Sequence, residues 1–226
     1  MTTRLTIVMP TLNEAARIVV QVQALRGLRA RGVEVIVADG GSTDRTERLA
    51  RTGADAVLVS PRGRARQMNH GASEARGDVL LFLHADTTLP ADALEAIDAA
   101  FADPQALWGR FDVSIDGASP LLKWVAWTMN LRSRLTGIAT GDQAMFVRRE
   151  AFQRVGGFPQ QPLMEDIELS KRLRKLARPV ALRQRVTTSG RRWERNGVCR
   201  TIVLMWLLRG LYWIGMPADR LARMYR

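Results

Sequence analysis

The chain has 226 residues, 46% of them hydrophobic, and a formal net charge of +12, so it is long enough for one sizeable core. The charge is uneven, because residues 183–226 contain ten arginines and only two acids. This excess of cations suggests an anionic partner, either a membrane surface or a phosphorylated substrate. No recognisable nucleic-acid-binding motif accompanies this positive charge, so we expect no nucleic-acid partner.

Two further features of the sequence bear on the cellular compartment of the protein. The single Cys199 excludes an intramolecular disulfide, and its apolar surroundings predict that it is buried. No basic-then-apolar leader precedes the strand-like residues that begin at Leu5, which predicts a cytoplasmic protein.

In the first half of the chain, apolar runs alternate with helical periodicity. Strands are expected at 5–9, 33–38, 56–59 and 78–86, with helices at 15–28, from residue 44, and at 67–76. This alternation predicts an α/β fold with a doubly wound, mostly parallel sheet. Asp39 and Asp86 end two of the strands, and Thr11 to Glu14 follow the first. Ligands bind beyond the carboxyl ends of such strands, so these residues predict a site.

The second half is less regular. Helices are expected at 94–101, 120–135 and 165–176, a half-exposed strand at 111–115 and another strand at 143–147. No internal repeat or low-complexity linker divides the chain. We therefore expect one domain over residues 1–197, followed by an apolar and basic helix over 198–226.

The residues alone leave the chemistry open. The Gly-x-Gly-x-x-Gly, P-loop and Gly-x-Ser-x-Gly motifs are absent, which argues against a dinucleotide dehydrogenase, a P-loop NTPase and a serine hydrolase. Asp86 suits a magnesium ion held together with substrate phosphates, and His84 is either a second ligand or a structural residue. The basic loop at 62–69 suits a diphosphate or is a solvated charge run. Glu165 and Asp166 are site acids or simple helix-dipole partners.

Five motifs in order carry a resemblance to a known family. They are Pro10-Thr11-Leu12-Asn13-Glu14, Asp39-Gly40-Gly41-Ser42-Thr43-Asp44, His84-Ala85-Asp86, Gly156-Gly157-Phe158 and Glu165-Asp166. With these motifs the chain resembles the inverting glycosyltransferases of family 2, which have the GT-A fold. Residues 63–69 and 82–87 are similar to a small bacterial subgroup labelled arsenosugar-biosynthesis glycosyltransferases.

The resemblance implies roles for individual residues. Thr11, Glu14 and Asp39 would contact the uracil and ribose of a UDP-sugar. The remaining nucleotide-sugar contacts implied are Pro10, Asn13, Arg64, Asn69, His84, Ala85 and Asp86. Asp86 would be the main ligand of a magnesium or manganese ion, because His84 stands where the family's first metal-binding carboxylate is usual.

On the acceptor side, the resemblance makes Asp166 the general base. Acceptor contacts are implied for Gly141, Asp142, Gln143, Glu165, Arg192 and Trp193, the last two from a degenerate Gln-x-x-Arg-Trp motif in which Ser189 replaces the glutamine. The acceptor itself is a small molecule or a lipid-linked compound, and transfer of a single sugar is expected.

Two alternatives remain. One is a sugar-phosphate nucleotidyltransferase, although Thr11 to Glu14 is not the glycine-rich basic loop expected there. The other is a non-catalytic, membrane-associated nucleotide-sugar-binding protein. Residues 198–216 are nearly apolar, but Arg209 disfavours a membrane span. They form either an interfacial helix at the inner face of the cell membrane or a helix that packs on the domain.

Overall fold

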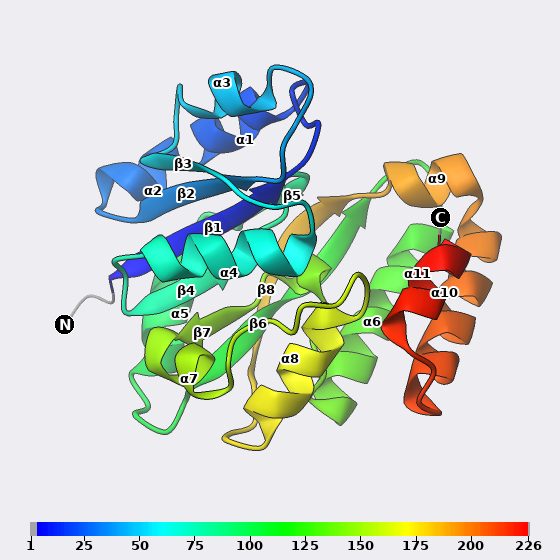
Figure 1. Cartoon of the computed structure of the whole chain (residues 1–226). Coiled ribbons are helices and arrows are strands. Elements are labelled where there is room, and N and C mark those ends of the chain that lie inside the picture. Colours follow the sequence, from blue (N-terminus) through cyan, green and yellow to red (C-terminus); the bar gives the residue numbers. More distant parts are fainter. Residues whose placement is uncertain (1–3, 226) are drawn as a thin grey trace.

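The computed structural model describes residues 4–225 and confirms the predicted α/β fold (Figure 1). A sheet of eight strands has the order β3-β2-β1-β4-β7-β6-β8-β5. The strands are β1 (Leu5–Thr11), β2 (Glu34–Asp39), β3 (Ala56–Val59), β4 (Val79–Phe82), β5 (Thr87–Thr88), β6 (Trp108–Asp116), β7 (Phe146–Arg148) and β8 (Val180–Ser189). The first four are mutually parallel, as their continuous apolar runs predict.

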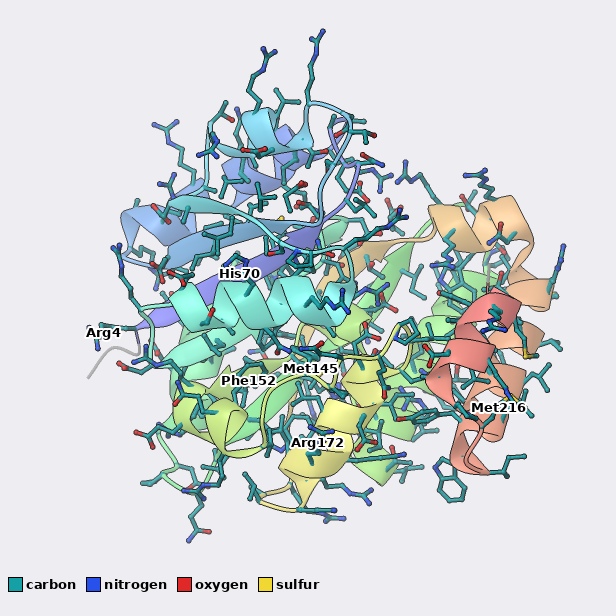
Figure 2. The ribbon with its side chains drawn as sticks, in the orientation of Figure 1. Arg4, His70, Met145, Phe152, Arg172 and Met216 are labelled. Atoms are coloured by element: carbon teal, nitrogen blue, oxygen red, sulfur yellow. The ribbon has the colours of Figure 1, made fainter. Side chains whose placement is uncertain are left out.

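Helices cover both faces of this sheet. One face carries α1 (Ile18–Ala24), α2 (Arg26–Ala30), α3 (Thr46–Ala50), α5 (Ala93–Phe101) and α6 (Leu121–Thr136). The other carries α4 (Arg64–Glu74), α7 (Arg149–Arg154) and α8 (Glu165–Arg174), which lie in front of the sheet in Figure 1. Alternate residues of β1 serve the two cores: Ile7 and Met9 face the first, and Val8 faces the second. Met145 and Phe152 also belong to the second core (Figure 2).

The strand ends that carry polar residues meet at one edge. In the β1–β2 ladder Thr11 is the partner of Asp39, and β4 runs parallel to β1 on its other side. The expected strand at 78–86 is shorter, since β4 ends at Phe82 and His84 to Asp86 form the loop beyond it. The architecture thus places these loops side by side, as the sequence predicts.

Two helix boundaries differ from expectation. The helix expected at 15–28 is divided at Leu25 into α1 and α2. Helix α4 begins at Arg64 instead of Gln67, immediately after Gly63, whose φ of +137° is easily adopted only by glycine. This earlier start places Arg64 at the N-terminus of a helix that points toward the polar edge.

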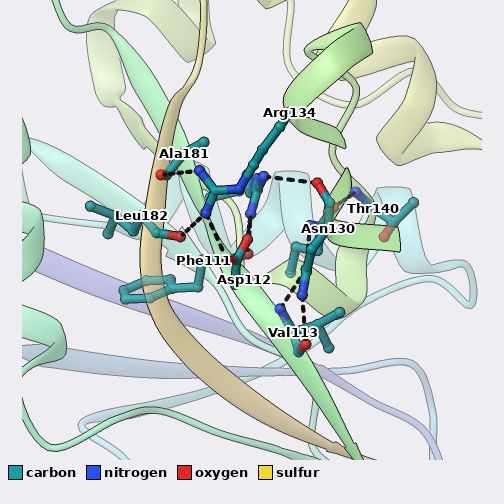
Figure 3. A network of polar contacts seen from close by, with 10 residues as sticks. Phe111, Asp112, Val113, Asn130, Arg134, Thr140, Ala181 and Leu182 are labelled. Atoms are coloured by element: carbon teal, nitrogen blue, oxygen red, sulfur yellow. Dashed lines mark hydrogen bonds and ion pairs between the residues drawn. The ribbon is translucent and has the colours of Figure 1, made fainter. Parts of the chain in front are cut away.

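The prediction that residues 111–115 form a half-exposed strand is wrong. Strand β6 lies between β7 and β8, and both of its faces are buried for most of its length. The polar residues that suggested solvent form a buried network instead (Figure 3). Arg110 pairs with Asp112, which also accepts a hydrogen bond from Arg134 of α6 at 2.7 Å. Asn130 of α6 bonds both backbone groups of Val113, so polar contacts fix α6 to the sheet.

The C-terminal region forms three helices, α9 (Arg191–Asn196), α10 (Val198–Trp213) and α11 (Ala218–Tyr225), and the last two take the place of the single helix expected over residues 198–226. The chain reverses between α10 and α11 at Gly215, which has a φ of +92°, and Pro217. Leu208 of α10 and Leu221 of α11 are completely buried against Ile167 of α8 and its neighbours, so this segment packs on the domain.

Two more findings concern this region. Cys199 is exposed, contrary to its predicted burial, because it lies on the outer side of the first turn of α10. None of the helices formed by residues 4–225 combines the length and the apolar character needed to cross a membrane.

Candidate active site

The ends of β1 and β2 form the first part of the site. The carboxylate of Asp39, only 1% exposed, accepts hydrogen bonds from the Thr11 hydroxyl at 3.2 Å and from the backbone N–H groups of Gly41 and Ser42 at 3.0 and 2.7 Å. The Ser42 hydroxyl adds a fourth bond at 2.5 Å. One buried carboxylate therefore fixes the whole turn that follows β2.

The loop after β1 is tied to the same turn. Asn13 has a φ of +56°, a conformation that asparagine tolerates better than most residues. Its side-chain oxygen accepts the N–H of Thr43 at 2.9 Å, and its own N–H donates to the Ser42 hydroxyl at 2.8 Å. The N–H of Glu14 donates to the Thr46 hydroxyl at 2.7 Å, which holds the loop after β1 against α3.

His84 and Asp86 extend the edge beyond β4. His84 Nδ1 lies 3.4 Å from a carboxylate oxygen of Asp142, and its Nε2 is buried without a hydrogen-bond partner among the described residues. A Cβ on Gly141 would lie 2.5 Å from this Nε2, so the ring is pressed against the Gly141 backbone. Its position indicates a residue that holds Asp142, with little room for a ligand at Nε2.

The start of α8 supplies the other side of the site. Met164, just before the helix, has a left-handed φ of +64°, an uncommon conformation for a residue with a side chain and one that occurs often at functional sites. Asp166 follows, and its Oδ2 accepts the N–H of Gly141 at 2.8 Å while its Oδ1 accepts the N–H of Ile167 at 2.7 Å. Two backbone donors therefore orient this carboxylate.

Neighbouring charges tune the acids of the site. Burial raises the pKa of Glu165, although Arg64, 3.3 Å away, opposes the shift. Burial also raises the pKa of Glu14, and the charge of Asp86 adds to the effect. For Asp142 burial acts in the same direction, but the hydrogen bond and charge of His84, with Arg64 and Arg209 nearby, lower its pKa overall.

A cavity of about 180 Å³ joins these elements. Of the residues that the sequence places in the site, it is lined by Arg64, His84, Asp86, Gly141, Asp142, Glu165, Asp166, Arg192 and Trp193. Asp86 and Asp166, from opposite sides of the molecule's polar edge, therefore open into one space. Pro10, Thr11, Asn13, Glu14 and Asp39 lie outside this cavity, at the ends of β1 and β2. Ala85 is buried in the first core and does not line the cavity.

Two predicted contacts need correction. Gln143 is completely buried, and its side-chain oxygen accepts the N–H of Thr140 at 3.2 Å, so it shapes the loop, and it does not line the cavity. Both ends of the Asn69 amide bond the backbone of Phe158, at 2.8 and 2.9 Å. Asn69 thus fastens α4 to the turn at Gly157 and lies outside the cavity.

The structure adds residues that the sequence did not reveal. Arg209 of α10 and Tyr225 of α11 both line the cavity, and the guanidinium of Arg192 lies 4.0 Å from the centre of the Tyr225 ring. Burial raises the pKa of this tyrosine, whereas Arg192 and Arg64 oppose the shift. Arg209 interrupts an otherwise apolar run, and that interruption was the one available signal of a buried function.

No group of three or more His, Cys, Asp or Glu side chains within residues 4–225 is arranged to hold a metal ion. Asp86 is one carboxylate at the edge of the cavity, and the field of this carboxylate reaches Glu14. A donor set this small fits magnesium or manganese only when substrate phosphates complete the coordination.

The α/β sheet, with acids beyond its parallel strands, has the GT-A glycosyltransferase fold, as its match to solved structures shows. A mannosyltransferase from Pyrobaculum calidifontis, solved with GDP-Man and Mn²⁺, has a TM-score of 0.61 and 27% identity, and the match covers 83% of this chain and 57% of that one. The S. aureus TarS 1–349 structure with UDP-GlcNAc has a TM-score of 0.65 at 18% identity, covering 82% and 58%.

Sequence comparison identifies the family. The model for glycosyl transferase family 2 matches residues 6–156. The succinoglycan biosynthesis protein ExoA of Rhizobium meliloti is 32% identical over 192 residues, which cover 75% of this chain and 57% of that protein. The chain belongs to glycosyltransferase family 2, and it spans little more than half the length of this relative.

Proposed function

We propose that the protein transfers a single sugar from a nucleoside-diphosphate sugar, with UDP as the expected nucleotide, to an acceptor hydroxyl with inversion at the anomeric carbon. The observation that carries the proposal is that Asp86 and Asp166 line the same cavity. One lies on the side of the nucleotide loops, and the other begins a helix on the opposite side. A donor held at the first carboxylate would present its sugar to the second.

Asp166 is the proposed general base. Each of its oxygens already accepts one backbone N–H, and an ionised carboxylate has further lone pairs for the acceptor hydroxyl. As the acceptor oxygen attacks the anomeric carbon, the bond from that carbon to the diphosphate breaks, its electron pair leaves with the nucleoside diphosphate, and the hydroxyl proton passes to Asp166. A positioned base typically contributes about 10²–10⁴-fold in rate.

The donor side is proposed to bind the nucleotide through Thr11, Glu14 and Asp39, and its diphosphate through Arg64. Arg64 begins α4, where the helix N-terminus and the guanidinium both favour an anion. Asp86, together with the donor's phosphates, is the proposed holder of a magnesium or manganese ion. When bound, that ion would neutralise charge on the diphosphate.

The acceptor side is proposed to include the backbone of Gly141 and the side chains of Asp142, Glu165, Arg192 and Trp193. All five residues line the cavity. The acceptor is proposed to be a small molecule or a lipid-linked compound. Exposed tryptophans on α6 and α10, with the arginine-rich C-terminal region, support peripheral contact with an anionic membrane at its cytoplasmic face.

Release of UDP from a panel of UDP-sugars, with manganese or magnesium present, tests the proposal. Asp166→Asn keeps the size of the side chain and removes its basicity, so turnover should fall by about 10²–10⁴-fold while UDP still binds. Asp219→Asn, an exposed acid of α11, is the matched control and should retain activity.

The alternatives give different results in the same assay. A nucleotidyltransferase would release pyrophosphate from a nucleoside triphosphate instead of UDP from a UDP-sugar. A binding protein without catalysis would bind UDP and show no turnover above Asp166→Asn. Full turnover in Asp166→Asn would exclude this residue as the base.

A further inference from the structure

A second hollow lies beside the candidate active site, in the groove between α6 and α10. It has a volume of about 370 Å³ and is lined mainly by apolar side chains. Trp124 and Met129 of α6 face Met205 and Trp206 of α10 across it. Asp142, Trp193, Met205 and Arg209 line both hollows. The apolar groove therefore adjoins the cavity that contains Asp166, and the two share these four side chains in their walls.

Two arginines stand in this apolar surrounding. The Nε and Nη2 atoms of Arg132 and the Nε of Arg209 are buried and have no hydrogen-bond partner among the described residues. Arg132 makes one hydrogen bond, from Nη1 to the carbonyl oxygen of Ile138 at 3.2 Å. Within residues 4–225 neither arginine has a carboxylate within ion-pair distance. Buried charges are normally paired, so a bound anion would stabilise these two guanidinium groups.

The two arginines also affect one another. Burial lowers the pKa of Arg132 to about 9, and the positive charge of Arg209 adds to the effect. Burial lowers the pKa of Arg209 as well, with Asp166 and Asp142 opposing the shift. At neutral pH both guanidinium groups are charged. An anion between them would relieve their repulsion, and guanidinium groups match the oxygens of a phosphate in two-pronged hydrogen bonds.

The outer rim of the groove is apolar and exposed. Trp124, Leu131 and Leu135 of α6 and Trp206 of α10 line the groove and are exposed, and the exposed large hydrophobic side chains elsewhere on these two helices are Leu121, Trp127, Val203, Leu207 and Trp213. Trp206 is 65% exposed and Trp213, at the end of α10, is 84% exposed. Figure 1 shows α6 and α10 together at one end of the molecule, beside α11. Tryptophans are enriched where proteins meet the membrane–water interface.

We propose that this groove binds the acceptor, and that the acceptor is a phospholipid with a hydroxyl in its headgroup. Its phosphate lies on Arg132 and Arg209, its chains lie against Trp124 and Trp206, and its hydroxyl reaches the cavity of Asp166. The shared position of Arg209 in both hollows sets the phosphate next to the proposed base. This inference rests on the proposed transfer of a sugar to a hydroxyl.

Binding of a monomeric short-chain lipid tests the groove without measuring catalysis. The probe is dihexanoylphosphatidylglycerol below its micelle concentration, followed by calorimetry and by tryptophan fluorescence. Glycerol phosphate tests the phosphate without chains, and dihexanoylglycerol tests the chains without a phosphate. We expect the complete lipid to bind at least about tenfold more tightly than either part, because only it satisfies both the cations and the apolar walls.

Variants locate the binding site. Arg132→Gln/Arg209→Gln should weaken binding of the complete lipid at least about tenfold, and Trp206→Ala should weaken it through loss of apolar contact. Arg45→Gln/Arg48→Gln removes the same charge from exposed positions near α3, which packs against β2 toward the β3 edge of the sheet, away from α6 and α10, and should leave binding unchanged. Thermal unfolding of every variant shows that it is folded, and Arg132→Lys should restore part of the affinity.

Three results would overturn the inference: no binding of the complete lipid, equally tight binding of glycerol phosphate, or equal losses in the two double-arginine variants. UDP titration of the same protein separates this failure from failure of the proposed function. UDP binding and UDP-sugar turnover without lipid binding would refute the lipid acceptor alone. Lipid binding without binding of UDP or of any other nucleoside diphosphate would refute the proposed glycosyl transfer itself. With both sites active, mass spectrometry should detect the glycosylated phosphatidylglycerol.

Discussion

The two sides of the candidate site differ in how completely their polar groups are satisfied. On the nucleotide side, Asp39 alone accepts four hydrogen bonds, and the turns after β1 and β2 hold one another. Beside the proposed acceptor cavity, buried side-chain nitrogens of Arg132 and Arg209 have no hydrogen-bond partner among the described residues.

The two sides therefore differ in how many of their buried polar groups are hydrogen-bonded before a ligand binds. A turn whose hydrogen bonds are internal has its shape before the nucleotide arrives, which lowers the entropic cost of binding. Buried donors without partners are costly in the ligand-free protein, and a ligand that supplies the acceptors recovers that cost. The proposed nucleotide side is therefore preorganised, whereas the proposed acceptor side has buried donors that a ligand would pair.

The largest expected effect on stability comes from replacing Asp39 on the proposed nucleotide side. In Asp39→Ala the four donors lose their common acceptor, and an unsatisfied buried donor costs about 1–3 kcal/mol. Some of the donors will reach water, so we expect a total loss of about 3 kcal/mol in the free energy of unfolding, measured by urea denaturation, together with loss of UDP binding. Asp39→Asn keeps one oxygen acceptor and should lose less. Equal stability of Asp39→Ala and the wild type would show that the turn does not depend on this carboxylate.

Asn69→Ala should have the next largest effect. It removes both hydrogen bonds to the Phe158 backbone, and we expect a loss of about 2 kcal/mol in unfolding free energy. UDP affinity should change little if the amide is structural. A large loss of UDP affinity with unchanged stability would instead restore the role implied by the family resemblance. Ser73→Ala, one turn farther along α4 and exposed, is the control for the helix.

Acid should weaken the acceptor side through Asp142. Because the folded protein lowers the pKa of this group, its contribution to stability is present above the unfolded value near pH 4 and is lost as the pH falls through the lower folded value. The wild type should therefore lose its stability advantage over Asp142→Asn as the pH falls from 5 to below 4. Thermal unfolding at several pH values measures the difference. A constant difference across that range would mean that Asp142 is not held as an ion by His84 and its neighbours.

The smallest expected effect on stability comes from Glu14, on the proposed nucleotide side, and its pH dependence is opposite to that of Asp142. The folded protein raises the pKa of Glu14, so folding favours its protonated form, and stability falls as the pH rises through the unfolded and then the folded value. Glu14→Gln should be slightly more stable than the wild type at pH 7 and equal to it below pH 4. If a divalent ion together with UDP removes this difference at pH 7, the ion lies close enough to Glu14 and Asp86 to stabilise their charges.

The sequence predicted the meeting of the strand-end loops at one sheet edge well, because the signals for it are local. The apolar runs of β1, β2 and β4 and the polar residues directly after them are contiguous in the chain, so their meeting at one sheet edge follows from the parallel topology. Even there, the use of Asn69 to hold Phe158, 89 residues away in sequence, could not be inferred from α4 alone.

The acceptor side was predicted less well because its signals depend on distant partners. Arg110 and Asp112 alternate with apolar residues like solvent-facing positions, and only the neighbouring β8 and Arg134 explain their burial. Strand β8 itself was not predicted, since its charged residues obscure the pattern. The reversal that brings α11 and Tyr225 to the cavity depends on packing against α8, which no local motif encodes.

The exposed Cys199 gives this protein a practical advantage. It is the chain's single cysteine and lies in the first turn of α10, the helix that forms one wall of the groove. A thiol-reactive fluorophore would therefore label one known position without any engineered mutation. Its emission would report changes around α10 when nucleotide, cation or lipid is added, and the order in which ligands occupy the two sides of the site could be followed in real time.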